Sequence, residues 1–139
     1  MTAETAPSDP APSDRVVLDA SAVLAWLRDE PGATVVDTLL AAGVVCAANW
    51  AETWQKLRQH GVDADRATRR LRVLGVRVEP LTVADAVVAA RLWEPTRRAG
   101  LSLGDRCCLA LATRLECPAL TADTVWAELD LAVPIRLIR

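Results

Sequence analysis

Short runs of β-branched and aliphatic residues alternate along the chain with longer segments of helical periodicity. The apolar runs predict buried strands at 16–18, 44–46, 76–78, 119–121 and 135–138. Between them, apolar residues recur at helical spacing and predict helices at 21–29, 33–42, 49–60, 63–74, 82–98, 103–115 and 124–130. We expect Pro95 to kink or break the long helix 82–98.

The order of these elements indicates the fold class. Short strands that alternate with helices are typical of an α/β fold with a mostly parallel sheet and helices on both of its faces. We expect this fold to occupy residues 15–139 as one domain, since 139 residues are enough to bury a single core. Residues 1–14 contain three Pro and three acids but no base, and we expect a flexible acidic, proline-rich tail there.

The composition argues against several classes of protein. Apolar residues make up 52% of the chain, which is typical of a globular protein rather than a disordered one. No apolar run approaches the ~18 residues that a membrane helix needs. Residues 1–14 lack the basic and apolar regions of a signal peptide. We therefore expect a cytoplasmic protein with no membrane partner.

Charge and cysteine content permit nucleic acid binding and argue against zinc. The net charge is −2, but residues 15–139 hold 16 bases against 15 acids, a mildly basic balance that permits nucleic acid binding without requiring it. The chain has no C-x-x-C pair, and His60 is its only histidine, so a zinc site is not expected. The four cysteines are Cys46, Cys107, Cys108 and Cys117. Cys107 and Cys108 lie in an apolar helical pattern, for which buried, reduced thiols are the simpler interpretation.

For four carboxylates, the sequence leaves both a structural and a functional role open. Asp19 and Asp123 directly follow predicted strands, where an aspartate can cap the next helix. Glu52 and Asp105 each lie three residues after an Asn or a Ser, which is the spacing of a capping box. Helix capping alone explains each residue when it is considered separately.

Considered together, the same four acids indicate a metal site. The carboxyl ends of parallel strands lie along one edge of a sheet, where α/β proteins bind ligands, and all four acids are predicted near that edge. Two carboxylates about 4 Å apart repel by roughly 4 kcal/mol at an effective dielectric near 20, so counterions or shared protons are needed. Oxygen ligands without His or thiolate partners select Mg²⁺ or Mn²⁺. Such ions support phosphoryl chemistry by activating water.

These segments resemble the PIN-domain family, and within it the VapC-type toxins. The matching pieces are VVLDASAVLAWL (16–27), DEPG (29–32), NWAETW (49–54), LSLGDRCCLALA (101–112) and LTADTVW (120–126). Their order and spacing agree over residues 15–139, which is everything but the tail. The departures are the acidic tail and the bulky Arg106 with Cys107 and Cys108, which replace smaller residues common after the third acid.

The resemblance implies a three-layer α/β/α sandwich around a five-stranded, mostly parallel sheet. It also implies a Mg²⁺- or Mn²⁺-dependent endoribonuclease that leaves a 5′-phosphate and acts as a growth-inhibiting toxin neutralised by a cognate antitoxin. The catalytic and metal-binding acids that it carries over are Asp19, Glu52, Asp105 and Asp123. Among them Asp19 and Asp105 are the principal metal ligands. Ser21 and Thr121 match the hydroxyl positions that orient these acids or their waters.

Two further groups of residues are candidates for partner contacts. Arginines gather on the predicted helix 63–74, and the candidate RNA contacts are Arg66, Arg69, Arg70 and Arg106, with a solvated helix face as the alternative. The chain has five Trp but no Phe or Tyr. Trp26, Trp50 and Trp54 fall on the two helices that border the antitoxin groove in the resembling family, and core packing is the alternative for them.

Other functions stay open at this point. A response-regulator receiver is also a five-stranded α/β protein that binds Mg²⁺, but it needs a late lysine, and Lys56 is the only lysine here. The remaining alternatives are a non-catalytic PIN-like RNA-binding or scaffold domain and a housekeeping RNA-processing nuclease. Expected partners are RNA and an antitoxin, and a homodimer is left open.

Overall fold

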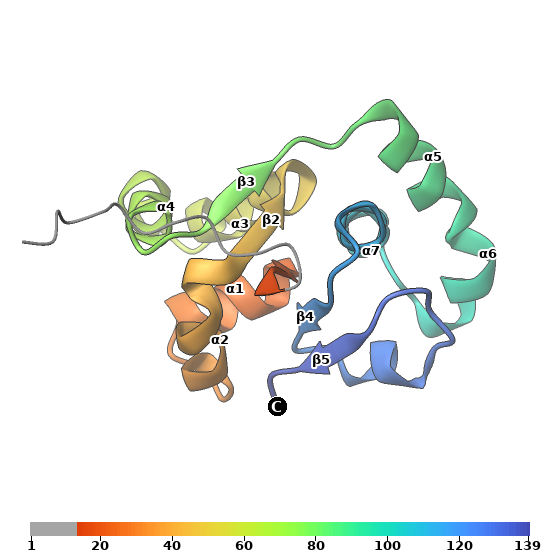
Figure 1. Ribbon diagram of the computed structural model, residues 1–139. Coiled ribbons are helices and arrows are strands. Elements are labelled where there is room, and N and C mark those ends of the chain that lie inside the picture. Colours follow the sequence, from red (N-terminus) through yellow and green to blue (C-terminus); the bar gives the residue numbers. More distant parts are fainter. Residues whose placement is uncertain (1–13) are drawn as a thin grey trace, which may run out of the picture.

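The computed structural model describes residues 14–139, so the predicted tail lies almost entirely outside the described residues. Five parallel strands form one sheet in the order β3-β2-β1-β4-β5 (Figure 1). The strands are β1 (Val16–Leu18), β2 (Gly43–Cys46), β3 (Arg77–Glu79), β4 (Ala119–Thr121) and β5 (Ile135–Leu137). The predicted strands thus lie within one residue of the observed ones, and the predicted parallel α/β fold is confirmed.

Helices fill the connections between the strands. The α-helices are α1 (Ala20–Leu27), α2 (Ala33–Leu39), α3 (Ala47–Gln59), α4 (Ala64–Val73), α5 (Val83–Arg91), α6 (Trp93–Thr96) and α7 (Leu103–Leu115). Three short 3₁₀ segments complete the described chain: η2 (Leu40–Ala42), η3 (Arg97–Ala99) and η4 (Thr124–Glu128). None of the helices between residues 14 and 139 combines the length and the apolar character needed to cross a membrane.

The two faces of the sheet bury separate apolar layers. Val17, Val44 and Ala119 point to the layer that α7 and α5 cover. Their neighbours Val16 and Leu120 point to the opposite layer, which α1 and α2 cover. This alternation is the two-residue period of a strand buried on both faces. It produces the predicted three-layer sandwich, whose helices flank the sheet in Figure 1.

Three predicted helices are divided, shortened or of another type in the structure. The segment predicted as 82–98 is divided into α5, α6 and η3, and α5 ends at Arg91. Pro95 explains the division, because its ring would clash with the carbonyl four residues earlier, which belongs to Arg91. The segments predicted as 33–42 and 124–130 are shorter than expected: the first changes to 3₁₀ geometry after Leu39, and the second is the 3₁₀ segment η4.

The strand order places one edge of the sheet where a ligand can enter. The chain moves outward from β1 to β2 and β3, and then returns to β4 on the other side of β1. The carboxyl ends of β1 and β4 therefore flank a topological switch point, where open α/β sheets bind ligands. Asp19 directly follows β1, and Asp123 comes two residues after the end of β4.

Candidate active site

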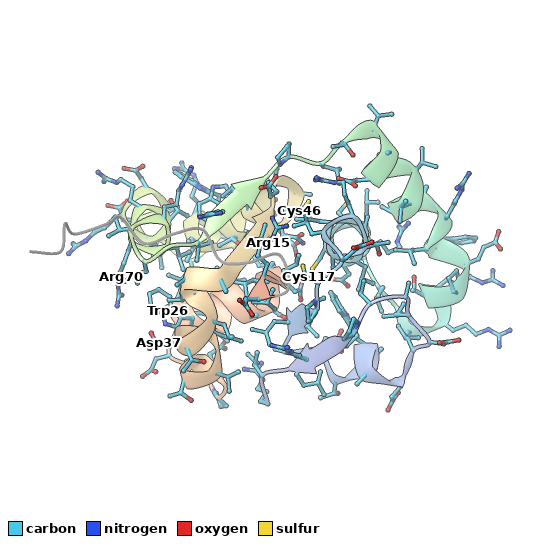
Figure 2. The ribbon with its side chains drawn as sticks, viewed as in Figure 1. Arg15, Trp26, Asp37, Cys46, Arg70 and Cys117 are labelled. Atoms are coloured by element: carbon cyan, nitrogen blue, oxygen red, sulfur yellow. The ribbon has the colours of Figure 1, made fainter. Side chains whose placement is uncertain are left out.

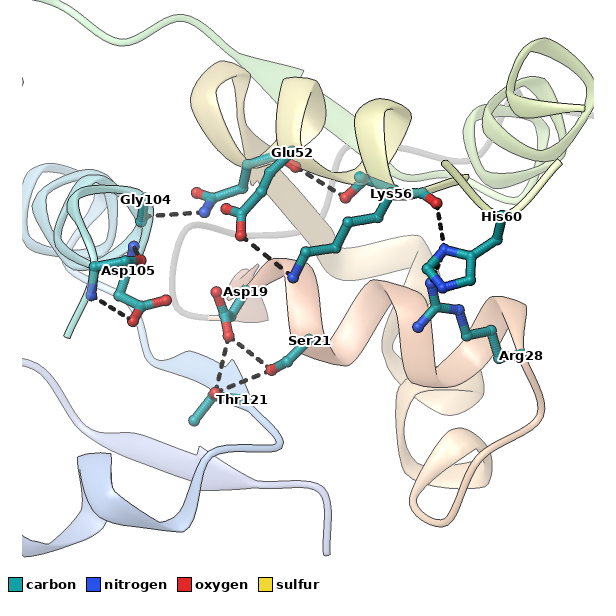
Figure 3. Close-up of polar contacts among 12 residues, drawn as sticks. Asp19, Ser21, Arg28, Glu52, Lys56, His60, Gly104, Asp105 and Thr121 are labelled. Atoms are coloured by element: carbon teal, nitrogen blue, oxygen red, sulfur yellow. Dashed lines mark hydrogen bonds and ion pairs between the residues drawn. The ribbon is translucent and has the colours of Figure 1, made fainter. Parts of the chain in front are cut away.

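Asp19 is the most deeply buried acid at this edge. It is 3% exposed and occupies the N-cap position of α1, yet its side chain makes no capping hydrogen bond. Its Oδ2 instead accepts hydrogen bonds from the hydroxyls of Ser21 (2.7 Å) and Thr121 (3.0 Å) (Figure 3). The capping interpretation of Asp19 is therefore wrong. Its Oδ1 has no hydrogen-bond partner among residues 14–139.

This environment favours the protonated, neutral form of the Asp19 carboxyl. Burial raises the pKa of its carboxyl most strongly, and the negative charges of Asp105 and Glu52 raise it further. The hydrogen bonds from Ser21 and Thr121 lower it but do not compensate, so the pKa of Asp19 rises from 3.8 to about 6. Two neutral hydroxyls orient this carboxylate without neutralising it.

Glu52 reaches the same edge from α3, although not as predicted. The helix begins at Ala47 rather than near Asn49, so Glu52 lies in the second turn and the capping box with Asn49 does not exist. Asn49 is fully buried, and its Nδ2 donates to the carbonyl of Gly104 on α7 at 3.0 Å. Asn49 is of a type that often caps helices, but here its side chain holds α3 against α7.

Gly104 brings Glu52 close to α7. A Cβ atom on Gly104 would lie 2.6 Å from Glu52 Oε1, so any larger residue would displace the carboxylate. The other carboxylate oxygen, Oε2, lies 3.7 Å from Nζ of Lys56, one helical turn further along α3. Glu52 therefore contacts the turn that carries Asp105 on one side and a lysine ammonium on the other.

Asp105 belongs to the capping box of α7, and the pKa of its carboxyl is also raised. Its Oδ2 accepts a hydrogen bond from the Ser102 backbone at 2.9 Å, and its own N–H donates to Ser102 Oγ, so the predicted capping box is observed. Burial is nevertheless the main influence on its carboxyl and raises its pKa, with a further rise from the charge of Asp123. The Ser102 hydrogen bonds and the charge of Lys56 act in the opposite direction.

Asp123 is the most exposed of the four acids. It caps η4, where its Oδ1 accepts from the Val125 N–H at 3.1 Å, as the capping interpretation predicts. Its own N–H donates to Thr121 Oγ1 at 3.1 Å, and the same hydroxyl donates to Asp19. Thr121 thus connects the ends of β1 and β4 at the switch point.

The four acids therefore share one electrostatic environment without forming a closed ligand set. Within residues 14–139, no three His, Cys, Asp or Glu side chains stand close enough to hold a metal ion in the arrangement described. The donor chemistry nevertheless fits a hard cation, because the acids supply only oxygen. The Asp19 Oδ1, which has no hydrogen-bond partner among the described residues, fits the same ion.

The model of the PIN domain family matches residues 16–131. The chain belongs to the PIN-domain family. No curated protein matches the sequence significantly.

Solved structures of toxin–antitoxin systems have the same fold as this PIN domain. VapC20 of Mycobacterium tuberculosis, a sarcin–ricin-loop-cleaving toxin, is 17% identical with a TM-score of 0.65, over 81% of this chain and 94% of that one. FitAcB of Neisseria gonorrhoeae is 20% identical with a TM-score of 0.65, over 86% and 95%. VapBC2 of Rickettsia felis, bound to a promoter DNA fragment, is 9% identical with a TM-score of 0.67, over 88% and 97%. At these identities the likeness establishes a common fold.

The tryptophans of the PIN domain occupy different environments. Trp126 is fully buried, which confirms core packing for that residue, and Trp93 is 49% exposed. Trp26, Trp50 and Trp54 are half-buried on α1 and α3. The Trp26 indole donates to Asp37 at 3.0 Å, and the Arg70 guanidinium lies 4.7 Å from its ring centroid (Figure 2).

The candidate RNA-binding arginines do not form one surface with the acids. Arg66 and Arg70 line a hollow of about 460 Å³ between α1, α3 and α4, together with Leu27, Arg28, Leu57, Val62, Asp63 and Ala67. Arg69 pairs with Asp65 at 2.8 Å on the exposed side of α4. Arg106 donates to the Ala89 carbonyl at 2.9 Å, so its guanidinium is held on α5. A larger hollow of about 730 Å³ lies beside β3 and contains none of the four acids.

Three residues of the site were missed by sequence reasoning. Asn49 and Gly104 hold α3 against α7, and Lys56 contacts Glu52. The spacing of Glu52 and Lys56, four residues apart on a predicted helix, was an available signal for their ion pair. The spacing of Asn49, Thr53 and Leu57 also marks one helix face, and all three are buried.

Proposed function

We propose that the protein is a Mg²⁺- or Mn²⁺-dependent endoribonuclease that acts as a growth-inhibiting toxin and is neutralised by a cognate antitoxin. The observation that carries the catalytic part is Asp19, which is 3% exposed among other acids and has neutral hydroxyls as hydrogen-bond donors. A marginally stable domain gains nothing from such a carboxylate unless a cation binds it.

Each acid has a distinct part in this proposal. Asp19 and Asp105 are the principal ligands of the ion, and Glu52 and Asp123 complete the acidic site. Ser21 and Thr121 hold one oxygen of Asp19 and so direct the other toward the ion. Asn49 and Gly104 set the approach of Glu52 to Asp105. When bound, the ion lowers the pKa of a water and stabilises charge on the phosphodiester.

The toxin part of the proposal rests on family and fold. The chain is a PIN domain, and its structural neighbours include a Klebsiella pneumoniae toxin–antitoxin complex and the RNA-cleaving VapC20. These neighbours favour a toxin over the housekeeping nuclease and the non-catalytic scaffold. All four acids are present at the sheet edge, which also argues against a domain that has lost its chemistry.

The surface near Trp26, Trp50 and Trp54 suits an antitoxin segment. The lining of the hollow between α1, α3 and α4 includes the apolar Leu27 and Leu57 and the basic Arg28, Arg66 and Arg70. A second hollow of about 490 Å³ shares Leu27 and Arg70 with it and extends along Trp26 to α2. An amphipathic segment with acidic residues would complement this surface.

Purified protein with total RNA tests the catalytic part. We expect cleavage with Mn²⁺ or Mg²⁺, none with a chelator, and products that carry a 5′-phosphate. Asp19→Asn, Glu52→Gln, Asp105→Asn and Asp123→Asn should each reduce the rate by orders of magnitude while the protein remains folded. Asp130→Asn, at an exposed acid on the chain segment after η4, is the matched control. Full activity of the Asp19 or Asp105 variant would falsify the site.

Expression in the native host tests the toxin part. Expression of the active protein alone should stop growth, and the protein should co-purify with a small antitoxin when both are present. Trp54→Ala should weaken inhibition by the antitoxin and leave cleavage largely intact, because it keeps all four acids. Harmless expression of an active enzyme that has no partner would leave a housekeeping nuclease.

A further inference from the structure

Lys56 is an unusual residue in this chain because of its type and its place. It is the only lysine, whereas every other basic residue except His60 is an arginine. The side chain extends from α3 toward Glu52 and the end of the sheet that carries Asp19 (Figure 3). Among the ion pairs between described residues, only that of Lys56 involves one of the four acids.

The contact between Lys56 and Glu52 is loose. The 3.7 Å between Nζ and Oε2 exceeds the usual length of an N–H···O hydrogen bond. The side chains are 45% and 32% exposed, so solvent screens the pair and it adds little to stability. A pair of this kind forms and separates easily.

The charge of Lys56 also reaches beyond Glu52. Burial raises the pKa of Asp105 on α7, and the charge of Lys56 opposes that rise, so the ammonium acts on acids from two elements. The two basic residues of α7 are engaged elsewhere: Arg106 donates to the Ala89 carbonyl, and Arg114 binds Asp85. Lys56 is therefore the basic residue that compensates the acidic site directly.

We propose that Lys56 is the exchangeable cation of this site: it neutralises Glu52 in the metal-free protein and contacts an RNA phosphate once a metal ion takes over that carboxylate. This assignment rests on the proposed function. The chemistry of lysine suits both tasks, because its compact ammonium turns freely on a flexible stem, whereas an arginine would hold a carboxylate with two parallel hydrogen bonds.

The assignment has two physical consequences. A positive charge beside Glu52 repels an incoming dication and occupies one of its oxygen ligands, so Lys56 weakens metal binding in the absence of RNA. When RNA is present, the released ammonium adds one phosphate contact, and each such contact contributes to the salt dependence of binding. Lys56 thus weakens metal binding and strengthens RNA binding.

Two binding measurements test this with Lys56→Met, which keeps most of the unbranched side chain and removes its charge. Mn²⁺ binding without RNA is followed by calorimetry. Binding of a short, labelled, mixed-sequence single-stranded RNA is followed by fluorescence anisotropy in Ca²⁺ at several salt concentrations, with gels to verify that the RNA stays intact. Arg58→Met removes an exposed charge from the same helix and is the matched control. Lys56→Arg tests whether positive charge alone suffices.

We expect Lys56→Met to bind Mn²⁺ about tenfold more tightly than the wild type, and Arg58→Met to stay within about twofold because its charge is further away and screened. RNA binding by Lys56→Met should weaken about threefold to fivefold, with a log–log salt slope smaller by about 0.7. Lys56→Arg should not recover the salt slope, because its guanidinium would stay paired with Glu52.

Unchanged Mn²⁺ affinity, or unchanged RNA affinity and salt slope, in Lys56→Met would overturn the assignment. Neither readout requires cleavage. A wild-type protein that binds Mn²⁺ and RNA but cleaves nothing would therefore contradict the proposed function alone.

Discussion

Asp19 and Asp85 are both buried aspartates, at 3% and 2% exposure. The pKa of Asp19 is nevertheless raised, whereas that of Asp85 is lowered. Asp85 opens α5 in a capping box with Thr82, and Nε of Arg114 lies 3.0 and 3.1 Å from its two oxygens. Burial acts to raise the pKa of Asp85, but the hydrogen bonds from Thr82 and Arg114 outweigh it and lower the pKa. For Asp19 the balance is reversed, and its pKa rises to about 6.

The difference lies in where the compensating cation comes from. The sequence provides Arg114 for Asp85, so that acid is fully compensated within the fold. Asp19 receives two hydroxyls, and the charged groups that most affect it, Asp105 and Glu52, are negative. Asp85 therefore stabilises the metal-free protein, whereas the charge of Asp19 destabilises it until a cation binds. Breaking each arrangement should have opposite effects on stability.

The largest effect is expected at Asp85. Arg114→Leu should destabilise the protein by about 3 kcal/mol at pH 7, because it leaves a buried carboxylate without its cation. Since the folded-state pKa of Asp85 is lowered, its stabilising contribution is present above the unfolded pKa near 3.8 and is lost as the pH falls below it. The deficit of the variant should therefore shrink in acid. Urea unfolding at several pH values measures this, and a double variant with Asp85→Asn should recover part of the loss.

The opposite effect is expected at Asp19 in metal-free protein. An acid whose folded-state pKa is raised favours folding while protonated, so stability falls as the pH rises from about 4 to about 6. The shift from 3.8 to about 6 corresponds to roughly 3 kcal/mol above pH 6. Asp19→Asn should remove this penalty and raise stability at pH 7. Chemical unfolding between pH 4 and 7, with Asp130→Asn as control, decides it. An Asp19→Asn variant that loses stability at pH 7 would return Asp19 to a structural role.

A bound metal should supply for Asp19 what Arg114 supplies for Asp85. At a hundred times its dissociation constant, one ion adds about 2.7 kcal/mol, which for a domain of this size raises the melting temperature by roughly 9 °C. The rise should be larger at pH 7 than at pH 5, because protons compete for Asp19 at the lower pH. Thermal melts with Mn²⁺ at both values measure it. Equal shifts at pH 5 and pH 7 would argue that the ion binds elsewhere.

The smallest effect is expected at Gly104. Alanine in place of a helical glycine would ordinarily stabilise the helix by up to about 1 kcal/mol. Here the new Cβ would meet Glu52 Oε1 at 2.6 Å, so the gain should be lost and Mn²⁺ affinity should fall. Combining Gly104→Ala with Glu52→Ala should recover the gain in stability but not the affinity. Calorimetry and urea unfolding of Gly104→Ala, Glu52→Ala and the double variant measure both effects. A Gly104→Ala variant that gains stability and keeps its Mn²⁺ affinity would show that Gly104 has no contact with the site.

The sequence predicted those parts of the fold that depend on local pattern. Helix 103–115 and strand 119–121 have the observed bounds, and the position of Asp19 and Asp123 after two strands predicted their place at the carboxyl edge of the sheet. The start of α3 was predicted wrongly because Asn49 is a good capping residue, and only the tertiary contact with Gly104 shows its use. The spacing of Lys56 and Glu52 on one helix could have indicated their ion pair. Gly104 could not be assigned to the site beforehand, because its role depends on how closely α3 approaches α7.

Proton release on metal binding tests most directly whether Asp19 awaits an external cation. Calorimetric titration with Mn²⁺ at pH 6, in two buffers of different ionisation enthalpy, counts the protons released. A carboxyl with a pKa of about 6 is half protonated there, so its metallation should release about half a proton or more. The release should vanish near pH 8 and should be smaller in Asp19→Asn, which should also bind Mn²⁺ more weakly. Binding at pH 6 without proton release, or the same release from Asp19→Asn, would contradict the account.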